Sequence, residues 1–281
     1  MGLSLLAGSL VGTSVSVVAG GASRSDRVRQ QSQERYLEIT EIQGTVTYET
    51  GSLKAEGRPA KVGDRLRVSG EGISTGSNSR AKLTADNAIG TVALAENTNL
   101  QVKNLSTLPN GAKNTQLAMN RGQNRVRVRS FTNPQSRFSI QTPTGIAGVR
   151  GTDFTVIVRP NGETRVLTVQ GMVEVAAQNQ TQRLSAGSYS VIAPGKSPTP
   201  PGSISGNLRV SLQVLPAPDE GKVRVSGTVN PINSVLLNNQ ALEPSPTGQF
   251  DTVATLGPDR RLILVVRSPL GEEQVYELAV P

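Results

Sequence analysis

Three closely spaced arginines are the first residues in this sequence that could do chemistry. Arg125, Arg127 and Arg129 alternate with Val126 and Val128. On a β-strand, side chains at every second position share one face, about 7 Å apart, so the three guanidinium groups are predicted to form a row. Such a row suits the binding of an anionic polymer. It equally suits a solvated face, or an edge strand whose charges prevent unwanted pairing.

The run from Pro143 to Phe154 is the second such feature, and it reads Pro-Thr-Gly-Ile-Ala-Gly-Val-Arg-Gly-Thr-Asp-Phe. Its central residues are expected on a turn between two strands. One interpretation is an anion clamp made by Arg150 and a nest of free backbone N–H groups. In the other, a glycine supplies a backbone angle that other residues rarely adopt, and Arg150 pins the turn by pairing with Asp153 or Glu163. We favour the second, which makes the following a structural signature: Gly145, Arg150, Gly151, Thr152, Asp153 and Phe154.

The chain contains no histidine and no cysteine. This excludes a Ser-His-Asp triad, thiolate chemistry and the usual ligands of zinc, haem and iron–sulfur clusters. The candidate carboxylates Asp64, Asp86, Asp153 and Glu163 are scattered, although carboxylates far apart in sequence can still converge in space. We therefore expect no enzyme, no catalytic residue, no cofactor and no metal site.

Composition indicates the kind of partner. The formal net charge is +8 over 281 residues, which favours an anionic partner. Aromatic residues make up only 3% of the chain, so the stacking platforms that single-stranded nucleic acid needs are missing. We expect an anionic cell-wall or surface polymer, or another envelope protein, and no nucleic acid.

The amino-terminal segment suggests export. Residues 2–22 carry no charge, contain short apolar runs and end on small residues. This pattern predicts a signal peptide over residues 1–22, cleaved near Ala19 or Ala22, although no basic residue precedes the apolar part. The alternative is a retained membrane anchor, and only then do we expect contact with a membrane. Residues 23–36 are expected to be a flexible lead-in to an extracytoplasmic protein.

Alternation of apolar and polar residues begins at Leu37 and predicts an all-β fold. The strands recur about every ten residues, which is typical of a sandwich, a barrel or a solenoid-like β-stack. Residues 106–115 are predicted to be a loop because they are rich in Asn, Pro and Gly. The main predicted strands are Leu37–Ile42, Gly44–Tyr48, Arg80–Thr84, Gly90–Leu94, Asn99–Val102, Thr115–Met119, Asn124–Arg129, Phe138–Thr142, Asp153–Val158, Thr164–Val169, Met172–Ala176 and Tyr189–Ala193.

A proline-rich segment, residues 195–205, is predicted to be an extended linker, because proline cannot donate to a β-ladder. A second module follows over residues 206–281. Its six or seven short strands fit a small β-sandwich. The order of Val225-Ser-Gly-Thr-Val229, Val235-Leu-Leu-Asn-Asn239 and Gly248-Gln-Phe250 resembles that of bacterial immunoglobulin-like modules.

An ordered set of motifs between residues 37 and 194 resembles the FecR domain family. The run Pro143–Phe154 is similar to the family's glycine-rich "RGT" signature, and Asp86-Asn-Ala88 departs from the family's usual Asp-Gly. The other matching segments are Val62-Gly-Asp-Arg-Leu66, Ser74-Thr-Gly-Ser-Asn-Ser-Arg80, Asn97-Thr-Asn-Leu100, Val169-Gln-Gly-Met-Val-Glu-Val175 and Leu184-Ser-Ala-Gly-Ser-Tyr189.

The resemblance implies a FecR-type stacked β domain outside the cytoplasm, without a catalytic centre. The family's namesake is a membrane regulator that relays an iron-siderophore signal to a sigma factor. We expect instead an exported binding or scaffolding protein of the cell envelope, since the apolar run begins at Gly2 and leaves no room for a cytoplasmic relay segment. The alternative is a membrane-anchored signalling regulator of the FecR type.

Overall fold

The computed structural model describes residues 35–51, 57–86, 89–204, 207–219, 221–269 and 271–280. These residues form strands and turns only, which confirms the all-β prediction. No helix among them is long and apolar enough to cross a membrane. The predicted signal peptide or anchor lies outside the described residues, as does nearly all of the predicted lead-in.

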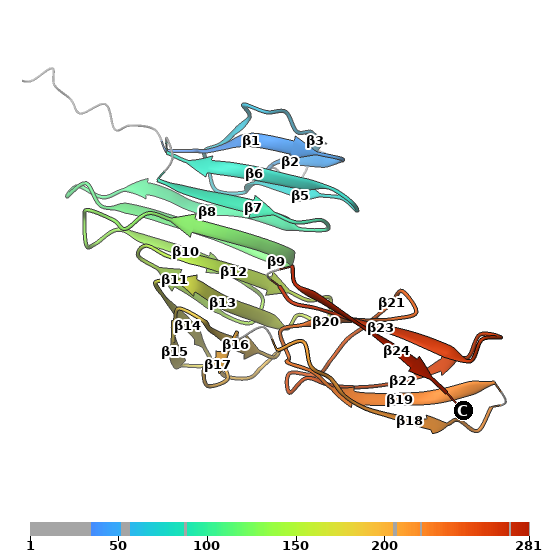
Figure 1. Ribbon diagram of the computed structural model, residues 1–281. Helices are drawn as coiled ribbons and strands as arrows, with labels where there is room; N and C mark the ends of the chain where they lie inside the picture. The colour runs from blue at the N-terminus through green and yellow to red at the C-terminus, as the bar shows by residue number, and fades with distance from the viewer. Residues whose placement is uncertain are drawn as a thin grey trace, which may run out of the picture. The chain divides into compact units, whose positions relative to one another are not determined.

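Seventeen strands form two sheets that are joined through one shared strand (Figure 1). Sheet A contains, in spatial order, β4 (Arg65–Leu66), β1 (Leu37–Gln43), β6 (Arg80–Ala85), β7 (Gly90–Leu94), β9 (Lys113–Val128), β12 (Asp153–Val158), β13 (Thr164–Gln170), β16 (Ser188–Ile192) and β17 (Gly202–Ser203). Sheet B contains β3 (Arg58–Pro59), β2 (Val46–Thr50), β5 (Glu71–Thr75), β8 (Asn99–Thr107), β9, β10 (Arg137–Gln141), β11 (Ile146–Val149), β14 (Met172–Ala177) and β15 (Gln180–Ser185).

Strand β9 belongs to both sheets. Its first part pairs with β8 and, in parallel, with β10, whereas residues from Gly122 onward pair with β7 and β12. The chain changes sheet at Gly122, where φ is +92° and a Cβ would lie 2.2 Å from the hydroxyl oxygen of Thr98. Only glycine meets both requirements at this position.

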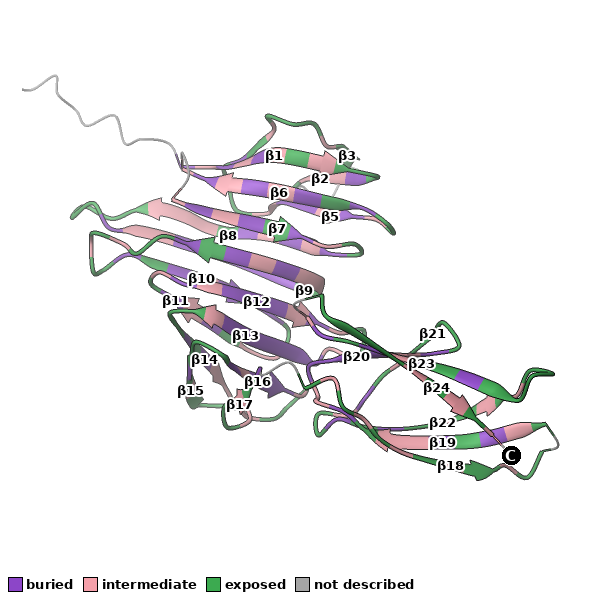
Figure 2. Cartoon of the chain, viewed as in Figure 1, coloured by how far each residue is buried: buried purple, intermediate pink, exposed green. Residues whose placement is uncertain are grey.

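The core lies between the two sheets and follows the alternation in the sequence. Along many strands, buried and more exposed residues alternate, whereas β13 is buried over five consecutive residues (Figure 2). Val, Leu and Ile supply most of this core, and Phe138 and Phe154 are the phenylalanines within it. Each fully buried side chain of this size contributes about 1.5–3 kcal/mol through the hydrophobic effect. The pairing of two apolar sheet faces therefore fixes which residues of each strand point outward.

The carboxyl-terminal part is a sandwich of two further sheets around its own core. One sheet has the order β18 (Ser211–Pro216), β19 (Lys222–Thr228) and β22 (Gln249–Thr255). The other has the order β21 (Gln240–Leu242), β20 (Ser234–Leu237), β23 (Arg261–Arg267) and β24 (Glu273–Ala279). The chain changes sheet between β19 and β20, between β21 and β22 and between β22 and β23.

Two segments differ from their predictions. The predicted loop over residues 106–115 is shorter, because β8 continues to Thr107 and β9 begins at Lys113. The proline-rich segment follows the edge of sheet A. Thr199 donates its N–H to Val191 O at 2.9 Å, and β17 pairs with β16. Proline lacks a donor, but the residues between the prolines keep theirs and use them here.

A small third cluster covers part of the outer surface of sheet A. Leu167 and Ile204 pack there against Ile232 of the carboxyl-terminal part. Beside them, Arg165 is fully buried and donates from Nε to Glu163 at 2.6 Å. Burial, helped by the nearby charge of Arg159, lowers the pKa of Arg165 to about 10, although Glu163 acts in the opposite direction.

Candidate functional site

The signature run crosses from sheet B to sheet A. Its first half forms β11, and Asp153 begins β12. At the corner, Thr152 exchanges two 2.9 Å backbone hydrogen bonds with Val128, and its hydroxyl donates to Met172 O at 3.0 Å. Gly151 has a φ of +153°, and a Cβ there would lie 2.6 Å from the Cα of Ser130. These contacts hold the two sheets together at one edge, which is a structural task.

Two further signature residues are tightly packed, Phe154 close to the corner and Gly145 just before the start of β11. Phe154 is fully buried between the sheets. A Cβ at Gly145 would lie 2.7 Å from Ala176 O, so this glycine lets two neighbouring segments approach. Arg150, in contrast, is exposed. The signature therefore contributes four packed residues, one carboxylate and one arginine that remains available to a ligand.

Arg125 and Arg127 lie on the outer face of sheet A, as predicted from their spacing, and Arg129 follows directly after the end of β9. The row is partly neutralised. Arg125 donates to both carboxylate oxygens of Asp153, at 2.9 and 2.8 Å, and Arg127 donates to Asp153 Oδ2 at 2.8 Å. The expected partners of Arg150 are thus taken, since Asp153 belongs to this row and Glu163 pairs with Arg165. The reason is geometric: Asp153 faces outward from sheet A, whereas Arg150 lies at the end of β11 in sheet B.

The ion pairs determine the titration of Asp153. Its burial acts to raise the pKa, but the hydrogen bonds from Arg125 and Arg127 outweigh this and hold the pKa below its usual value of 3.8. The pKa of Arg125 is raised, chiefly by the same hydrogen bond. Asp153 is therefore an anion at neutral pH and neutralises part of the row, which leaves the guanidinium of Arg129 without a partner among the described residues.

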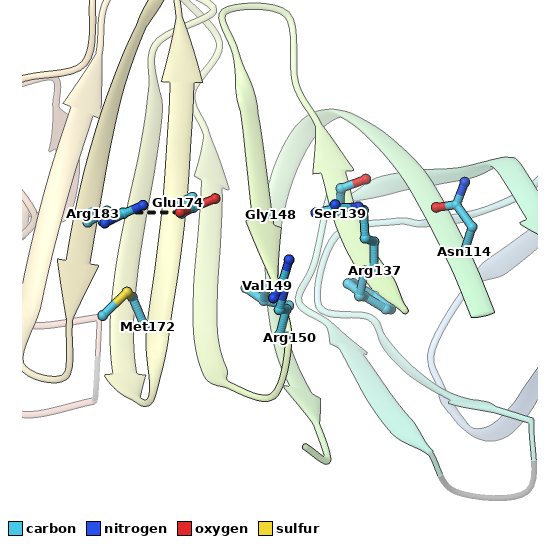
Figure 3. A pocket seen from close by; sticks show the side chains of 10 residues that line it. Asn114, Arg137, Ser139, Gly148, Val149, Arg150, Met172, Glu174 and Arg183 are labelled. Atoms are coloured by element: carbon cyan, nitrogen blue, oxygen red, sulfur yellow. Dashed lines mark hydrogen bonds and ion pairs between the residues drawn. The ribbon is translucent and has the colours of Figure 1, made fainter. Parts of the chain in front are cut away.

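The outer face of sheet B carries a groove of about 430 Å³ next to this corner (Figure 3). Its floor is centred on Gly148, which has no side chain and is paired with Ser139 on one side and Glu174 on the other. Arg137 and Arg150 stand on neighbouring strands along one side, at the same end of the Phe138–Val149 pair. The hollow exists because large side chains surround a single glycine.

The groove has an excess of positive charge. Glu174 accepts from Arg183 at 3.1 Å, so this carboxylate already has a partner. Within the described ranges, no hydrogen bond or ion pair engages the guanidinium group of Arg137 or of Arg150. Like charges on adjacent strands without an intervening carboxylate destabilise a sheet. The arrangement is therefore suited to an anion that arrives from outside.

The sequence pattern singled out Arg150, with pinning of the turn as the favoured role, and did not indicate its neighbours in the groove. Arg137, Met172 and Arg183 lie on three different strands, and only the register of the sheet brings them together. The alternation of apolar and polar residues in Phe138–Thr142 and Met172–Ala176 does indicate that Arg137 and Met172 face outward. It does not reveal which strands are adjacent.

The other carboxylates considered from the sequence have partners as well. Asp64 accepts from Arg58 at 2.7 Å, which holds its pKa below the usual value despite the opposing effect of burial. Asp86 lies 2.6 Å from Arg35. Over the described part of the chain, no three carboxylates gather closely enough to hold a metal ion. These side chains act as anchors of turns and strand ends.

Comparison with known proteins relates the stacked sheets to one family. Residues 71–174 match the family model described as FecR protein, a stretch that contains the whole signature run. Two crystal structures of a candidate anti-sigma factor from Parabacteroides distasonis are similar, with 17% identity and a TM-score of 0.40. The alignment covers 47% of this chain and 59% of that one, so less than two thirds of that protein is spanned. No curated protein matches the chain.

Proposed function

We propose that this chain is an exported, non-catalytic binding or scaffolding protein of the cell envelope, built on a FecR-like domain and recognising an anionic partner. One observation carries the proposal: arginines without carboxylate partners surround the signature corner on both sheets. These are Arg129, directly after the end of β9, and Arg137 and Arg150, which line the groove on sheet B. The match of residues 71–174 to the FecR family model supports the choice of an extracytoplasmic binding domain.

The test measures retention on an immobilised polyanion, dextran sulfate, with a salt gradient. Replacing Arg129, Arg137 and Arg150 together by Gln is expected to lower the salt concentration at which the protein elutes, because these charges face solvent without a competing carboxylate. Unchanged elution of this triple variant would contradict the proposal.

A matched control has the same change in net charge. Arg224, Arg261 and Arg267 lie on the carboxyl-terminal sandwich and pair with Asp251, Glu277 and Glu273. Their triple replacement by Gln is expected to change elution less, since each arginine is already neutralised. Equal shifts in both triple variants would mean that net charge alone controls retention, which also argues against a site.

A membrane-anchored signalling regulator is the second candidate, favoured by the same family match. The two functions differ in the fate of residues 1–22. Edman sequencing of the mature protein from an envelope fraction distinguishes them: a chain that begins near Ser23 supports the exported form, and an intact amino terminus in the membrane fraction supports the anchored regulator.

A further inference from the structure

Five strands of sheet B bring two rows of outward-facing residues together at the groove. The first row runs Gln116, Ser139, Gly148, Glu174 and Arg183, as the strand registers require. The second row contains Asn114 and Arg137, which are paired, then Arg150 at the end of β11, and Met172. The groove therefore offers, in order, an amide, two free guanidinium groups and a thioether beside a bare floor (Figure 3).

We propose that this groove binds an acidic polypeptide segment in an extended conformation, with one carboxylate held between Arg137 and Arg150 above Gly148. The inference rests on the proposed function and names the partner's chemistry. A guanidinium group presents a planar fork of donors that matches a carboxylate in a bidentate manner. Two guanidinium groups side by side repel each other, and a single acidic side chain between them would compensate this repulsion.

The apolar and neutral polar residues of the groove favour a peptide over a carboxylated glycan. Met172 is 54% exposed, and methionine is an adaptable contact for the varied side chains of a peptide. The side chains of Ser139 and Asn114 have no hydrogen-bond partner among the residues described, so they are available to peptide N–H and C=O groups. The one aromatic residue of the groove, Phe138, is 3% exposed and offers no ring on which a sugar could stack.

Gly148 provides the sharpest test. A Cβ at Gly148 would meet only Glu174 O, at 3.9 Å, and its φ is not in the left-handed region, so a larger residue fits without backbone strain. Gly148→Val is therefore expected to fold and to fill the groove. Binding is measured by fluorescence anisotropy with a labelled short peptide in which Glu alternates with Leu. We expect Gly148→Val to weaken binding at least about tenfold.

Three comparisons complete the experiment. The double variant Arg137→Gln, Arg150→Gln is expected to weaken binding by a similar factor. It replaces Gly148→Val as the test if that variant unfolds. Arg224→Gln, on the carboxyl-terminal sandwich, where Arg224 pairs with Asp251, is expected to leave peptide affinity unchanged. A peptide with Gln in place of Glu is expected to lose most of its affinity, because the carboxylate is the anchoring group.

The outcomes separate this inference from the proposed function. Failure of the acidic peptide to bind, or binding that neither groove variant weakens, overturns the inference. If dextran sulfate retention still depends on the three free arginines in that case, the proposed function stands alone. Polygalacturonate binding that Gly148→Val abolishes, without any peptide binding, would instead identify a glycan groove and also overturn the inference.

Discussion

At the scale of single residues, Asp153 is the charge on which the arginine row depends. It accepts hydrogen bonds from Arg125 and Arg127, and its side chain is only 14% exposed. The arginine side chains are 40% and 63% exposed, so solvent screening limits the strength of the pairs. We expect Asp153→Asn to reduce the free energy of unfolding at neutral pH by about 1–2 kcal/mol.

The pH dependence of stability follows from the same pairing. Because the pKa of Asp153 is lower in the folded than in the unfolded state, its stabilisation is complete above the ordinary carboxyl pKa of 3.8. It is lost as the pH falls through the lower, folded-state pKa. The difference in melting temperature between the native protein and Asp153→Asn should therefore shrink in acid. Asp219→Asn, which breaks an exposed pair with Lys222, is the control and should have little effect at any pH.

For single residues, the sequence predicted which strand face a side chain occupies better than it predicted which side chain it pairs with. The spacing of Arg125 and Arg127 correctly places them on one face of a strand, whereas Arg129 follows directly after the end of β9. Their partner was not predicted, because Asp153 reaches them only through the register of β12 on β9. Pairing across strands depends on tertiary contacts, which a local pattern does not contain.

At the scale of elements, the passage of β9 from one sheet to the other depends on Thr98. Its hydroxyl accepts from Gln123 N at 2.9 Å, directly after Gly122, and donates to a backbone carbonyl. Thr98 is fully buried. Thr98→Val keeps the shape and leaves the N–H of Gln123 without this acceptor, so we expect a loss of about 1–3 kcal/mol in the free energy of unfolding.

Urea denaturation measures this loss. Thr91→Val is the control, because Thr91 is half-buried on β7 and its hydroxyl bonds to none of the described residues. An equal change in both variants would show that the hydroxyl of Thr98 has no special role at the crossing.

The presence of each strand was the most predictable feature of this structure, because burial of one strand face directly produces an alternation of apolar and polar residues. The strands Leu37–Gln43, Asp153–Val158 and Thr164–Gln170 lie within a few residues of their predictions. The loop before β9 was overestimated, since only its Pro-Asn-Gly centre turns and the polar residues around it join the ladder of β8 and β9. The bare floor at Gly148 was not predicted, because a glycine in a strand has no sequence mark that distinguishes a groove from a bulge.

At the scale of the whole molecule, the buried pair of Glu163 and Arg165 stands out. Both side chains are 1% exposed, and Nη1 of Arg165 has no hydrogen-bond partner. Arg165 Nη2 lies 3.5 Å from Pro244 O, and Arg159 pairs with Glu243, so residues far apart in sequence close over the pair. The alternation of apolar and polar residues predicted that Arg165 lies on a strand. It could not show that residues near Pro244 cover its side chain.

Removing one partner of this pair should be severe. Glu163→Gln leaves the buried guanidinium without its compensating charge, and we expect a loss of about 3–5 kcal/mol in the free energy of unfolding. The double variant Glu163→Leu, Arg165→Met removes both charges and is expected to recover much of that loss. Differential scanning calorimetry measures the stability of the two variants. A double variant as unstable as Glu163→Gln would mean that the attraction within the pair exceeds the cost of removing both charges from water.

The order of strands in the two stacked sheets has a kinetic consequence. Half of the hydrogen-bonded strand pairs described here, such as β6 with β7, β12 with β13 and β14 with β15, are also neighbours along the chain. Their contacts close short loops, and short loops lose little entropy when they form. Such a chain can nucleate at many points and extend by adding strands at either side, as repeat proteins do. Both sheets must then form in register along β9, because the two segments of this one continuous strand pair in different sheets.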